Sequence, residues 1–230
     1  MEAVKVNISD FASGIGYCQY LVVNKYHLNL RPKETIFLQK GRMAHKTLEE
    51  EDKLVPRREA TKEELMDPFF PLDFTREGVQ VSIERENMNL FRYVGRTDKI
   101  IRANGSVIIL DDKVISTGIP RESVYPDRLI QLSAYCEGFI RNYSHMLAFN
   151  EICFKIVQRN PDNEILKETM FSFDEEAREL LQKSFTLFES LYNKTAQPQH
   201  HNNPNKCRAC RYFDCCQWRL VNPTFGPNVA

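Results

Sequence analysis

The dipeptide Asn104-Gly105 separates two runs of apolar and β-branched residues, KIIRA before it and SVIIL after it. An Asn-Gly pair between such runs is typical of a β-hairpin with a two-residue turn, because both central residues of a type I′ turn need a positive φ angle. A two-residue turn also sets the register, and counting outward from it places Asp98 directly opposite Asp111. The sequence therefore predicts a hairpin that carries two carboxylates on one face.

Opposed carboxylates on a hairpin have Cβ atoms about 5 Å apart and destabilise it unless a positive charge lies between them. Mg²⁺ or Mn²⁺ suits this position, because both ions prefer carboxylate oxygens. Lys113 lies two residues after Asp111 and so shares its face. Asp98, Asp111 and Lys113 are therefore a candidate metal site. A surface hairpin with two neighbouring acids, or a turn that includes Asp111 and Asp112, fits the same pattern.

The composition is that of an ordinary globular chain. The 230 residues are 42% hydrophobic and 27% charged, which is enough for one well-buried domain with a small appendage. The formal net charge is zero, so no overall electrostatic attraction to nucleic acid is expected. A DNA site would have to use local basic clusters, each of which is otherwise a solvated face: Arg92, Arg96, Lys99 and Arg102, or Lys40, Arg42 and Lys46.

The N-terminal sequence MEAVKVNISD lacks the apolar stretch of a signal peptide, and no run of about 18 apolar residues occurs. A cytoplasmic protein without membrane contact is therefore expected. In that setting the seven cysteines indicate thiol chemistry or metal ligation rather than disulfides.

Hydrophobic periodicity predicts the elements of secondary structure. Helices are expected over residues 9–25, 38–53, 126–143 and 173–194. Strands are expected within residues 78–95 and over 146–158 and 164–171, beside the two of the hairpin. An irregular connector is expected over 54–76 and a polar linker over 196–206.

Two further pairs lie at helical spacing. His45 follows Gly41 at i+4, and the glycine would allow another backbone to approach beside it. Gln131 and Tyr135 project side by side in the same way. Instead of a site residue, His45 could be a structural histidine, and Gln131 with Tyr135 could be the rim of an amphipathic helix.

The cysteines near the end of the chain have the spacing of a metal centre. Cys207 and Cys210 form a C-x2-C pair, whose geometry lets two thiolates bind one metal centre. Cys215 and Cys216 follow, and only one of them need be a ligand. Because three ligands leave a tetrahedral or cubane site one short, Cys18 in the first helix is the expected fourth.

The spacing suits Zn²⁺ and an iron–sulfur cluster equally well. His200 and His201 offer nitrogen ligands for a zinc site, or belong to a solvated linker. Ligation by Cys18 would close a long loop and attach the end of the chain to the first helix.

Taken together, these motifs resemble those of the RecB-like nucleases of the PD-(D/E)XK superfamily, and more closely the CRISPR-associated iron–sulfur exonucleases. The resemblance extends from Cys18 to Cys216. The family's G-x3-H motif matches Gly41 and His45, and its G-x-x-D motif matches Gly95 and Asp98. Its acidic-x-Lys motif matches Asp111 to Lys113, and its Q-x3-Y motif matches Gln131 and Tyr135. Its four cluster cysteines match Cys18, Cys207, Cys210 and Cys216.

The chain departs from the family pattern at three positions. Asp111 stands where glutamate is more usual, and Asp112 stands where an apolar or aromatic residue is common. Gln19 follows the first cysteine where the family often has proline. None of these changes removes a type of catalytic atom, so an active enzyme is expected. Asp112 would be an extra ligand or face the other side of the strand.

The resemblance implies an α/β fold, with a restriction-endonuclease-like core whose mixed central sheet is flanked by helices, over residues 1–195. A linker and cysteine-rich tail, 196–230, would pack on the N-terminal helix. The implied Mg²⁺ or Mn²⁺ ligands are His45, Asp98, Asp111 and the backbone carbonyl of Asp112.

In the implied mechanism, Lys113 orients the attacking water, and Gln131 and Tyr135 hold the catalytic residues or the DNA. The four cysteines, with Cys215 as the alternative to Cys216, would bind a 4Fe–4S cluster, with 2Fe–2S or Zn²⁺ as alternatives.

The implied activity is a metal-dependent exonuclease on single-stranded DNA ends, with 5′→3′ polarity, in CRISPR spacer acquisition or in repair. Its partners would be single-stranded DNA and CRISPR integrase proteins, and a homo-oligomer is compatible with the sequence. Two alternatives stay open, a non-catalytic DNA-binding adaptor that retains the fold and cluster, and a zinc-stapled repair nuclease.

Overall fold

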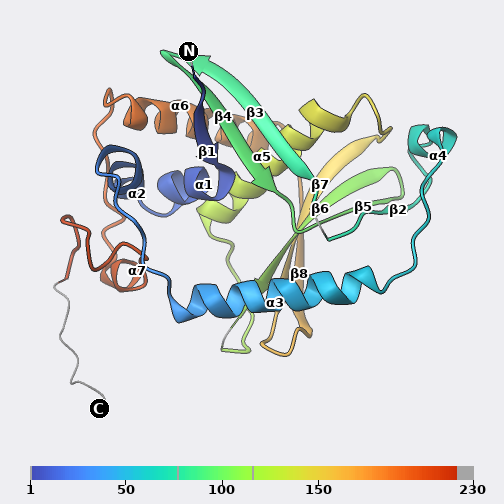
Figure 1. The fold of residues 1–230 in the computed structure, drawn as a ribbon, viewed down its shortest axis with the longest axis horizontal. Coiled ribbons are helices and arrows are strands. Elements are labelled where there is room, and N and C mark those ends of the chain that lie inside the picture. The colour runs from blue at the N-terminus through green and yellow to red at the C-terminus, as the bar shows by residue number, and fades with distance from the viewer. Residues whose placement is uncertain (1, 77, 116, 222–230) are drawn as a thin grey trace.

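The structure of the protein, a computed structural model, describes residues 2–76, 78–115 and 117–221 (Figure 1). The end of the predicted tail, 222–230, lies outside the described residues. The strands form two sheets. One has the order β1-β4-β3, from Val4–Asn7, Asn89–Arg96 and Gln80–Asn87. The other has the order β2-β5-β6-β7-β8, from Leu72–Asp73, Lys99–Ala103, Ser106–Val114, Glu151–Arg159 and Ile165–Ser172.

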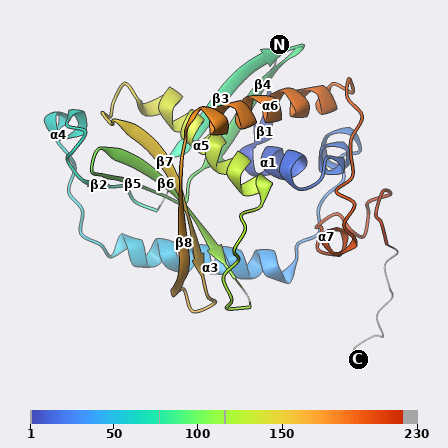
Figure 2. The same cartoon turned by 180° about the vertical axis from the view of Figure 1, so that it is seen from behind.

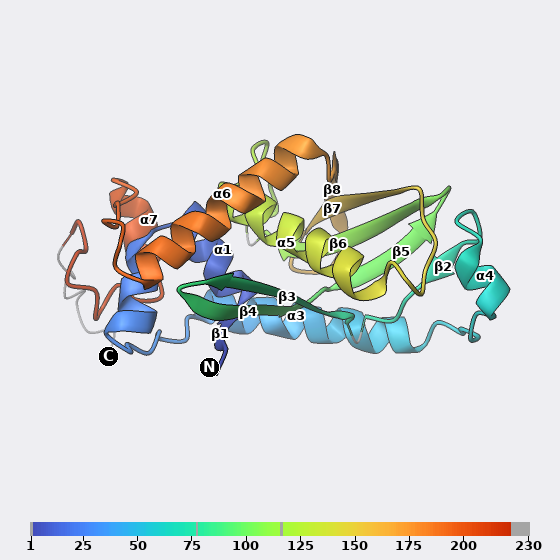
Figure 3. The ribbon, with the colours of Figure 1, turned by 90° about the horizontal axis from the view of Figure 1, so that it is seen from above.

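The pairs β1–β4 and β6–β7 are parallel and the other pairs are antiparallel, so both sheets are mixed. The helices are α1 (Ile8–Gly16), α2 (Tyr20–Val22), the π-helix η1 (Val23–His27), α3 (Ile36–Lys53), α4 (Lys62–Met66), α5 (Pro126–Tyr143), α6 (Glu175–Tyr192) and α7 (Pro204–Arg208). Seen from above, α5 and α6 lie on one side of the strands and α3 lies on the other (Figure 3). The predicted α/β architecture with a mixed sheet flanked by helices is confirmed.

The hairpin of β5 and β6 has the predicted register. Ala103 pairs with Ser106, and both turn residues have positive φ, 52° at Asn104 and 82° at Gly105. The ladder ends at the pair of Lys99 with Leu110, so Asp98 lies one residue before β5. Asp98 therefore sits where the chain crosses from β4 in the first sheet to β5 in the second.

The single helix expected over residues 9–25 is wrong. Helix α1 ends at Gly16, and the chain turns through Tyr17 and Cys18 before α2. Gly16 lies against the start of α5, where a Cβ atom would come within 2.3 Å of the amide nitrogen of Asp127. This close approach requires glycine, which weakens a helix, and the turn that follows places Cys18 toward the C-terminal segment.

Two other expectations need correction. The connector 54–76 is not wholly irregular, because it contains α4, which begins with a capping box at Thr61, and the short strand β2. The linker 196–206 already enters α7 at Pro204. The strand-like segment 78–95 is a hairpin of β3 and β4 that turns at Met88, whose φ is 53°. The remaining predicted elements match to within a few residues, apart from β7, which begins five residues later.

A cluster of buried aromatic rings fixes β4, the strand that leads to Asp98. Phe11 of α1 stacks on Phe185 of α6 with ring centroids 4.8 Å apart, and Tyr93 of β4 packs on both rings. Phe188 completes the cluster. All four rings are fully buried, so they hold α1 and α6 against the first sheet through apolar contact.

Helix α3 is held differently. Of its residues whose exposure is described, only Leu48 and Asp52 are buried. The Asp52 carboxylate accepts hydrogen bonds from Lys99 Nζ at 2.7 Å and from Arg57 at 2.7 Å. It also accepts the backbone N–H of Arg76 at 2.8 Å. Ionic contacts therefore replace much of the apolar packing that normally fixes a helix.

Replacing Asp52 with asparagine should lower the free energy of unfolding more at pH 7 than near pH 3. Burial alone would raise the pKa of Asp52, but the hydrogen bonds and charges of Lys99, Arg76 and Arg57 outweigh it and hold the pKa below its ordinary value. A lowered pKa means that the carboxylate stabilises the fold above about pH 4 and loses this effect as the pH falls through its folded value. Asp73 remains as a second acceptor for Lys99 and Arg57, so the expected cost at pH 7 is about 2 kcal/mol.

Urea denaturation of Asp52→Asn and of the parent chain at pH 7 and near pH 3 measures this effect. The difference in unfolding free energy should shrink at the lower pH. An equal difference at both values would show that the charge of Asp52 does not hold α3.

Candidate active site

Asp98 is fixed at the crossover between the two sheets. The preceding residue, Thr97, is buried, and its N–H donates to the carbonyl of Val79 at 3.1 Å. Asp98 Oδ2 accepts the backbone N–H of Asp112 at 3.0 Å. Burial and the charge of Asp111 raise the pKa of Asp98, against the opposing charges of Lys113 and His45. The structure thus places the carboxylate of Asp98 beside β6, the strand that carries Asp111.

Asp111 has one carboxylate oxygen with a partner and one without. Its side chain is almost fully buried, and Oδ1 accepts a hydrogen bond from Lys113 Nζ at 2.7 Å. Oδ2 is buried and has no hydrogen-bond partner among the described residues. An unpartnered charged oxygen in such surroundings is costly. Together with the raised pKa of Asp98, it marks a place where a divalent cation would relieve both penalties.

His45 reaches the same group from α3. Its Nδ1 lies 3.7 Å from Asp98 Oδ1. The expected approach of another backbone beside Gly41 is wrong, because no described atom other than those of Gly41, its neighbours and its own helical turns lies within 4 Å of the position where a Cβ would be. Gly41 instead leaves open space on the exposed side of the helix, one turn before His45.

Gln131 and Tyr135 lie beside the carboxylates on α5. Gln131 Nε2 donates to the Tyr135 hydroxyl at 3.1 Å, and Arg128 donates to Gln131 Oε1 at 3.1 Å. Burial raises the pKa of Tyr135, and the charges of both acids add to this effect. Gly95 of β4 accommodates the ring, since a Cβ there would lie 2.6 Å from Tyr135 Cε1.

Asp112 faces the opposite side of β6 from Asp111. Its buried carboxylate pairs with Arg76 and accepts a hydrogen bond from Arg159 Nε at 2.6 Å. Burial opposes ionisation, but these two arginines lower the pKa of Asp112 below its ordinary value. The Asp112 side chain is therefore not an extra ligand of the group around Asp111. The two arginines lie 36 and 47 residues away in sequence, so no local pattern could have identified them.

A cavity of about 310 Å³ opens beside His45 and Asp98, between α3 and β4. The residues that line it are Arg42, His45, Lys46, Glu49, Arg96 and Asp98. Lys99 and Arg102 are not part of this surface, because both are buried. Lys99 pairs with Asp52, and Arg102 donates to backbone carbonyls around α4. The basic surface at the site therefore comes mainly from α3.

The cysteines of the C-terminal segment lie beside Cys18. Cys18, Cys207 and Cys216 are buried, whereas Cys215 is exposed and its thiol contacts the carbonyl of Tyr212. Burial raises the pKa of Cys210 to about 11, and the three buried cysteines add to the shift through their charges. Cys216, and not Cys215, therefore lies with Cys18, Cys207 and Cys210.

The backbone around these sulfurs points N–H groups at them. Leu220 donates to Cys207 Sγ at 3.4 Å, and Tyr212 donates to Cys210 Sγ at 3.4 Å. The ring of Trp218 stacks on Tyr20 of α2 with centroids 4.6 Å apart. Helices α1, α2 and α7 accordingly lie at one end of the molecule, as the reverse view shows (Figure 2).

The described ligand atoms that come within 4.8 Å of one another near this group are those of Cys18, His200 and His201. Four thiolates on one zinc ion, with Zn–S bonds of about 2.3 Å, would lie about 3.8 Å apart. The cysteine sulfurs are thus more widely spread than a four-cysteine zinc site requires. Cys18 with the two histidines is an alternative candidate group for a metal ion, since it shares Cys18 with the four cysteines.

The fold and the paired carboxylates define a protein of the nuclease class. The sequence profile of the PD-(D/E)XK nuclease superfamily matches residues 42–217, more than half of the chain, and the chain belongs to this superfamily. Nucleases of this superfamily use divalent metal ions.

Two solved structures are similar over nearly the whole chain. SSO0001 has a TM-score of 0.55 and 15% identity, and the match covers 96% of this chain and 90% of that one. A protein of Eubacterium rectale, provisionally named an exonuclease, has a TM-score of 0.52 and 12% identity, with 96% and 91% covered. At these identities the similarity shows the fold. No curated protein matches the sequence at a significant level. The narrower CRISPR-associated iron–sulfur family stays a prediction.

None of the described helices combines the length and the apolar composition needed to cross a bilayer.

Replacing Asp111 with asparagine should abolish stabilisation of the protein by Mn²⁺. A ligand that binds only the folded state at about 100 times its dissociation constant stabilises it by about 2.7 kcal/mol. The parent chain should therefore unfold at a higher temperature with Mn²⁺ than with a chelator, and Asp111→Asn should not. Glu49→Gln removes a carboxylate from the cavity beside His45 and Asp98 and should keep the shift. An unchanged shift in Asp111→Asn would remove Asp111 from the metal site.

Proposed function

We propose that the protein is a metal-dependent DNA exonuclease that hydrolyses phosphodiester bonds at single-stranded ends. One observation carries the proposal. His45 lies 3.7 Å from Asp98, Lys113 lies 2.7 Å from Asp111, and Asp111 Oδ2 is buried without a partner among the described residues. An adaptor that only bound DNA would have no use for this costly arrangement of like charges.

The residue types at this site suit a divalent cation, whose binding would draw together ligand atoms of His45, Asp98 and Asp111 that do not all lie within 4.8 Å of one another. His45, Asp98, Asp111 and the backbone carbonyl of Asp112 would hold Mg²⁺ or Mn²⁺, and their oxygen-rich set suits either ion. When bound, such a cation supplies Lewis-acid polarisation of the scissile phosphate and lowers the pKa of the attacking water.

The other residues of the site orient the reactants. Lys113, 2.7 Å from Asp111 Oδ1, would position the water and stabilise the charge that builds on the phosphate oxygens. The water oxygen bonds to phosphorus as the bond to the 3′-oxygen breaks, which leaves a 5′-phosphate and a 3′-hydroxyl. The hydrogen-bonded pair of Gln131 and Tyr135 would hold the carboxylates in place from α5.

The DNA strand would approach along α3, whose exposed face carries Arg42 and Lys46 beside the cavity. We infer 5′→3′ polarity and a role in CRISPR spacer acquisition or DNA repair from the resemblance of the motifs. Interaction with CRISPR integrase proteins rests on the same argument, a cytoplasmic location rests on the absence of a signal-peptide pattern in the sequence, and a homo-oligomeric assembly is compatible with both.

The cysteine group would hold an iron–sulfur cluster, with 4Fe–4S as the expected type. The spread of the sulfurs and the two N–H groups that point at them support a cluster over a four-cysteine zinc ion. Hydrolysis needs no redox step, so the cluster would be structural and would join the C-terminal segment to α1 and α2. A zinc ion on Cys18, His200 and His201 is the alternative.

Cleavage of end-labelled single-stranded DNA by anaerobically purified protein tests the nuclease. The parent chain should cleave with Mn²⁺ or Mg²⁺ and not with a chelator, and the position of the label gives the polarity. Asp98→Ala should abolish cleavage, and Lys113→Met should lower it by about 10²–10³-fold. Glu49→Gln should cleave like the parent. Absence of cleavage with every metal, from a folded protein that binds DNA, would favour the adaptor instead.

Two neighbouring cysteines provide a matched test of the cluster. Cys216→Ala should lose iron and lower the midpoint of thermal unfolding by about 5 °C or more, because each kcal/mol is worth about 2–4 °C in a chain of this size. Cys215→Ala removes an exposed thiol and should keep both the iron and the midpoint. Iron retained in Cys216→Ala, or zinc found in place of iron, would contradict the assignment.

A further inference from the structure

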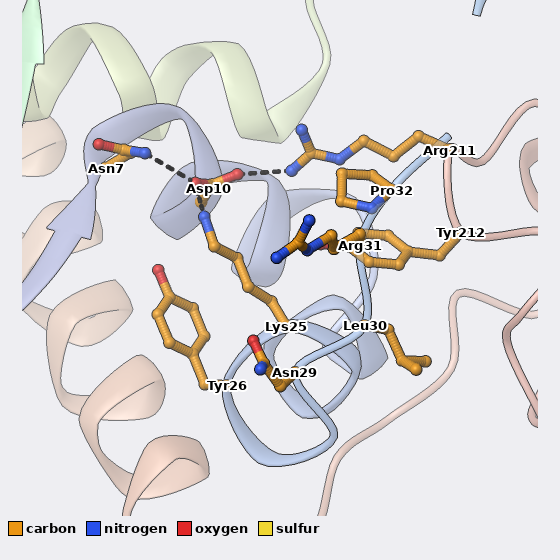
Figure 4. Close-up of a pocket in the computed structure, with 10 residues that line it drawn as sticks. All are labelled: Asn7, Asp10, Lys25, Tyr26, Asn29, Leu30, Arg31, Pro32, Arg211 and Tyr212. Atoms are coloured by element: carbon orange, nitrogen blue, oxygen red, sulfur yellow. Dashed lines mark hydrogen bonds and ion pairs between the residues drawn. The ribbon is translucent and has the colours of Figure 1, made fainter. Parts of the chain in front are cut away.

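A second cavity, of about 560 Å³, lies apart from the carboxylate group, at the junction of α1, η1, the segment before α3 and the cysteine-rich segment (Figure 4). Its walls carry three basic side chains, Lys25, Arg31 and Arg211, and one acid, Asp10. The resemblance to nucleases assigns none of them a role.

Asp10 organises two of the basic groups. Its carboxylate pairs with Lys25 on one oxygen and with Arg211 on the other, and Asn7 donates to it at 3.2 Å. Burial alone would raise the pKa of Asp10, but the hydrogen bonds from Lys25 and Arg211 lower it below its ordinary value. Asp10 therefore stays ionised and holds two cations side by side, as the dashed lines of Figure 4 show.

Positive charge remains in excess. Arg31 has no ion-pair or hydrogen-bond partner among the described residues, and in Figure 4 its guanidinium extends into the space between Lys25 and Arg211. Three positive charges thus face a single negative one. A cavity of this composition attracts an anion.

Two hydroxyl groups line the same cavity without partners. Tyr212 is 1% exposed, and its hydroxyl has no hydrogen-bond partner among the described residues. The same holds for the hydroxyl of Tyr26, which points toward Asp10 and Lys25 in Figure 4. A buried hydroxyl without a partner is costly, and a small shift of either ring toward the cavity that it lines would let the hydroxyl donate to an oxygen-rich ligand.

We propose that this cavity binds a phosphate group. Arginine and lysine with two hydroxyl donors match the several acceptor oxygens and the charge of a phosphate, and the guanidinium of Arg31 can bind two of these oxygens at once. The identity of the phosphate as part of a DNA strand rests on the proposed nuclease function.

The position of the cavity suits a strand that continues to the carboxylate group. Arg31 precedes α3 by five residues, and His45 follows the start of that helix by a rise of about 14 Å. A strand held at the cavity and passing along α3 would reach His45 after a few nucleotides, at about 3.4 Å per phosphate in a duplex strand and more when extended.

The cavity also gives the cysteine group a function beyond stability. Arg211 and Tyr212 lie between Cys210 and Cys216 in sequence, so a cluster bound to the four cysteines would fix the wall that carries them. Cluster loss would therefore displace one cation and one hydroxyl of the phosphate site.

Binding of single-stranded DNA in the presence of a chelator tests the proposal without cleavage. Two oligonucleotides labelled at the 3′ end, one with a 5′-phosphate and one with a 5′-hydroxyl, are titrated by fluorescence anisotropy, and inorganic pyrophosphate is used as competitor. Arg31→Ala should weaken binding about tenfold, because a hydrogen bond to a charged group is worth about 1.5–3 kcal/mol. Tyr212→Phe should weaken it about fivefold.

Lys33→Ala is the matched control. It removes one positive charge two residues from Arg31, but Lys33 is exposed, pairs with Asp214 at 3.1 Å and does not line the cavity. It should change the affinity by less than about twofold. All variants should have the melting temperature of the parent to within about 4 °C, since the changes are expected to cost at most about 1 kcal/mol of stability.

The two oligonucleotides distinguish the source of the phosphate. Loss of a preference for the 5′-phosphate in Arg31→Ala would identify a strand terminus, whereas equal weakening for both strands would identify an internal phosphate. The proposal is overturned if Arg31→Ala and Tyr212→Phe bind both strands like Lys33→Ala, or if pyrophosphate does not compete. The binding assay does not involve cleavage. If the protein fails to cleave DNA but still binds phosphate at this cavity, only the proposed nuclease function is refuted.

Discussion

The repulsion between the carboxylates of Asp98 and Asp111 is the constraint around which the structure is arranged. Asp111 is buried and Asp98 half-buried, and burial together with the charge of Asp111 raises the pKa of Asp98. Lys113 donates to Asp111, and His45 and the N–H of Asp112 lie against Asp98. One oxygen of Asp111 nevertheless has no partner among the described residues. A pair of neighbouring acids with an unpartnered buried oxygen is the kind of arrangement that is found at functional sites.

Apolar packing and ionic contacts position different residues of this site. Asp98 follows a strand that is fixed by a cluster of fully buried aromatic rings, including Tyr93. His45 lies on a helix that is held mainly through the ionic contacts of Asp52. The carboxylates are thus positioned by apolar packing, which is insensitive to salt, and the histidine by charges. The same helix connects the carboxylate group with the phosphate cavity around Arg31.

Local patterns in the sequence predicted the parts of the site that local geometry decides. The turn at Asn104-Gly105 determined the register of the hairpin, and the spacing of the acids and the lysine followed from it. The break in the first helix at Gly16 could not be predicted, because it depends on contact with α5, more than a hundred residues later. The arginine partners of Asp112 and the surroundings of Asp10 depend on tertiary contacts in the same way.

Anomalous diffraction from a crystal soaked in Mn²⁺ locates the ion without reference to activity. We expect a manganese peak within coordinating distance of the carboxylates of Asp98 and Asp111 and the imidazole of His45. A saturating soak with manganese bound elsewhere, and none between the two carboxylates, would contradict it.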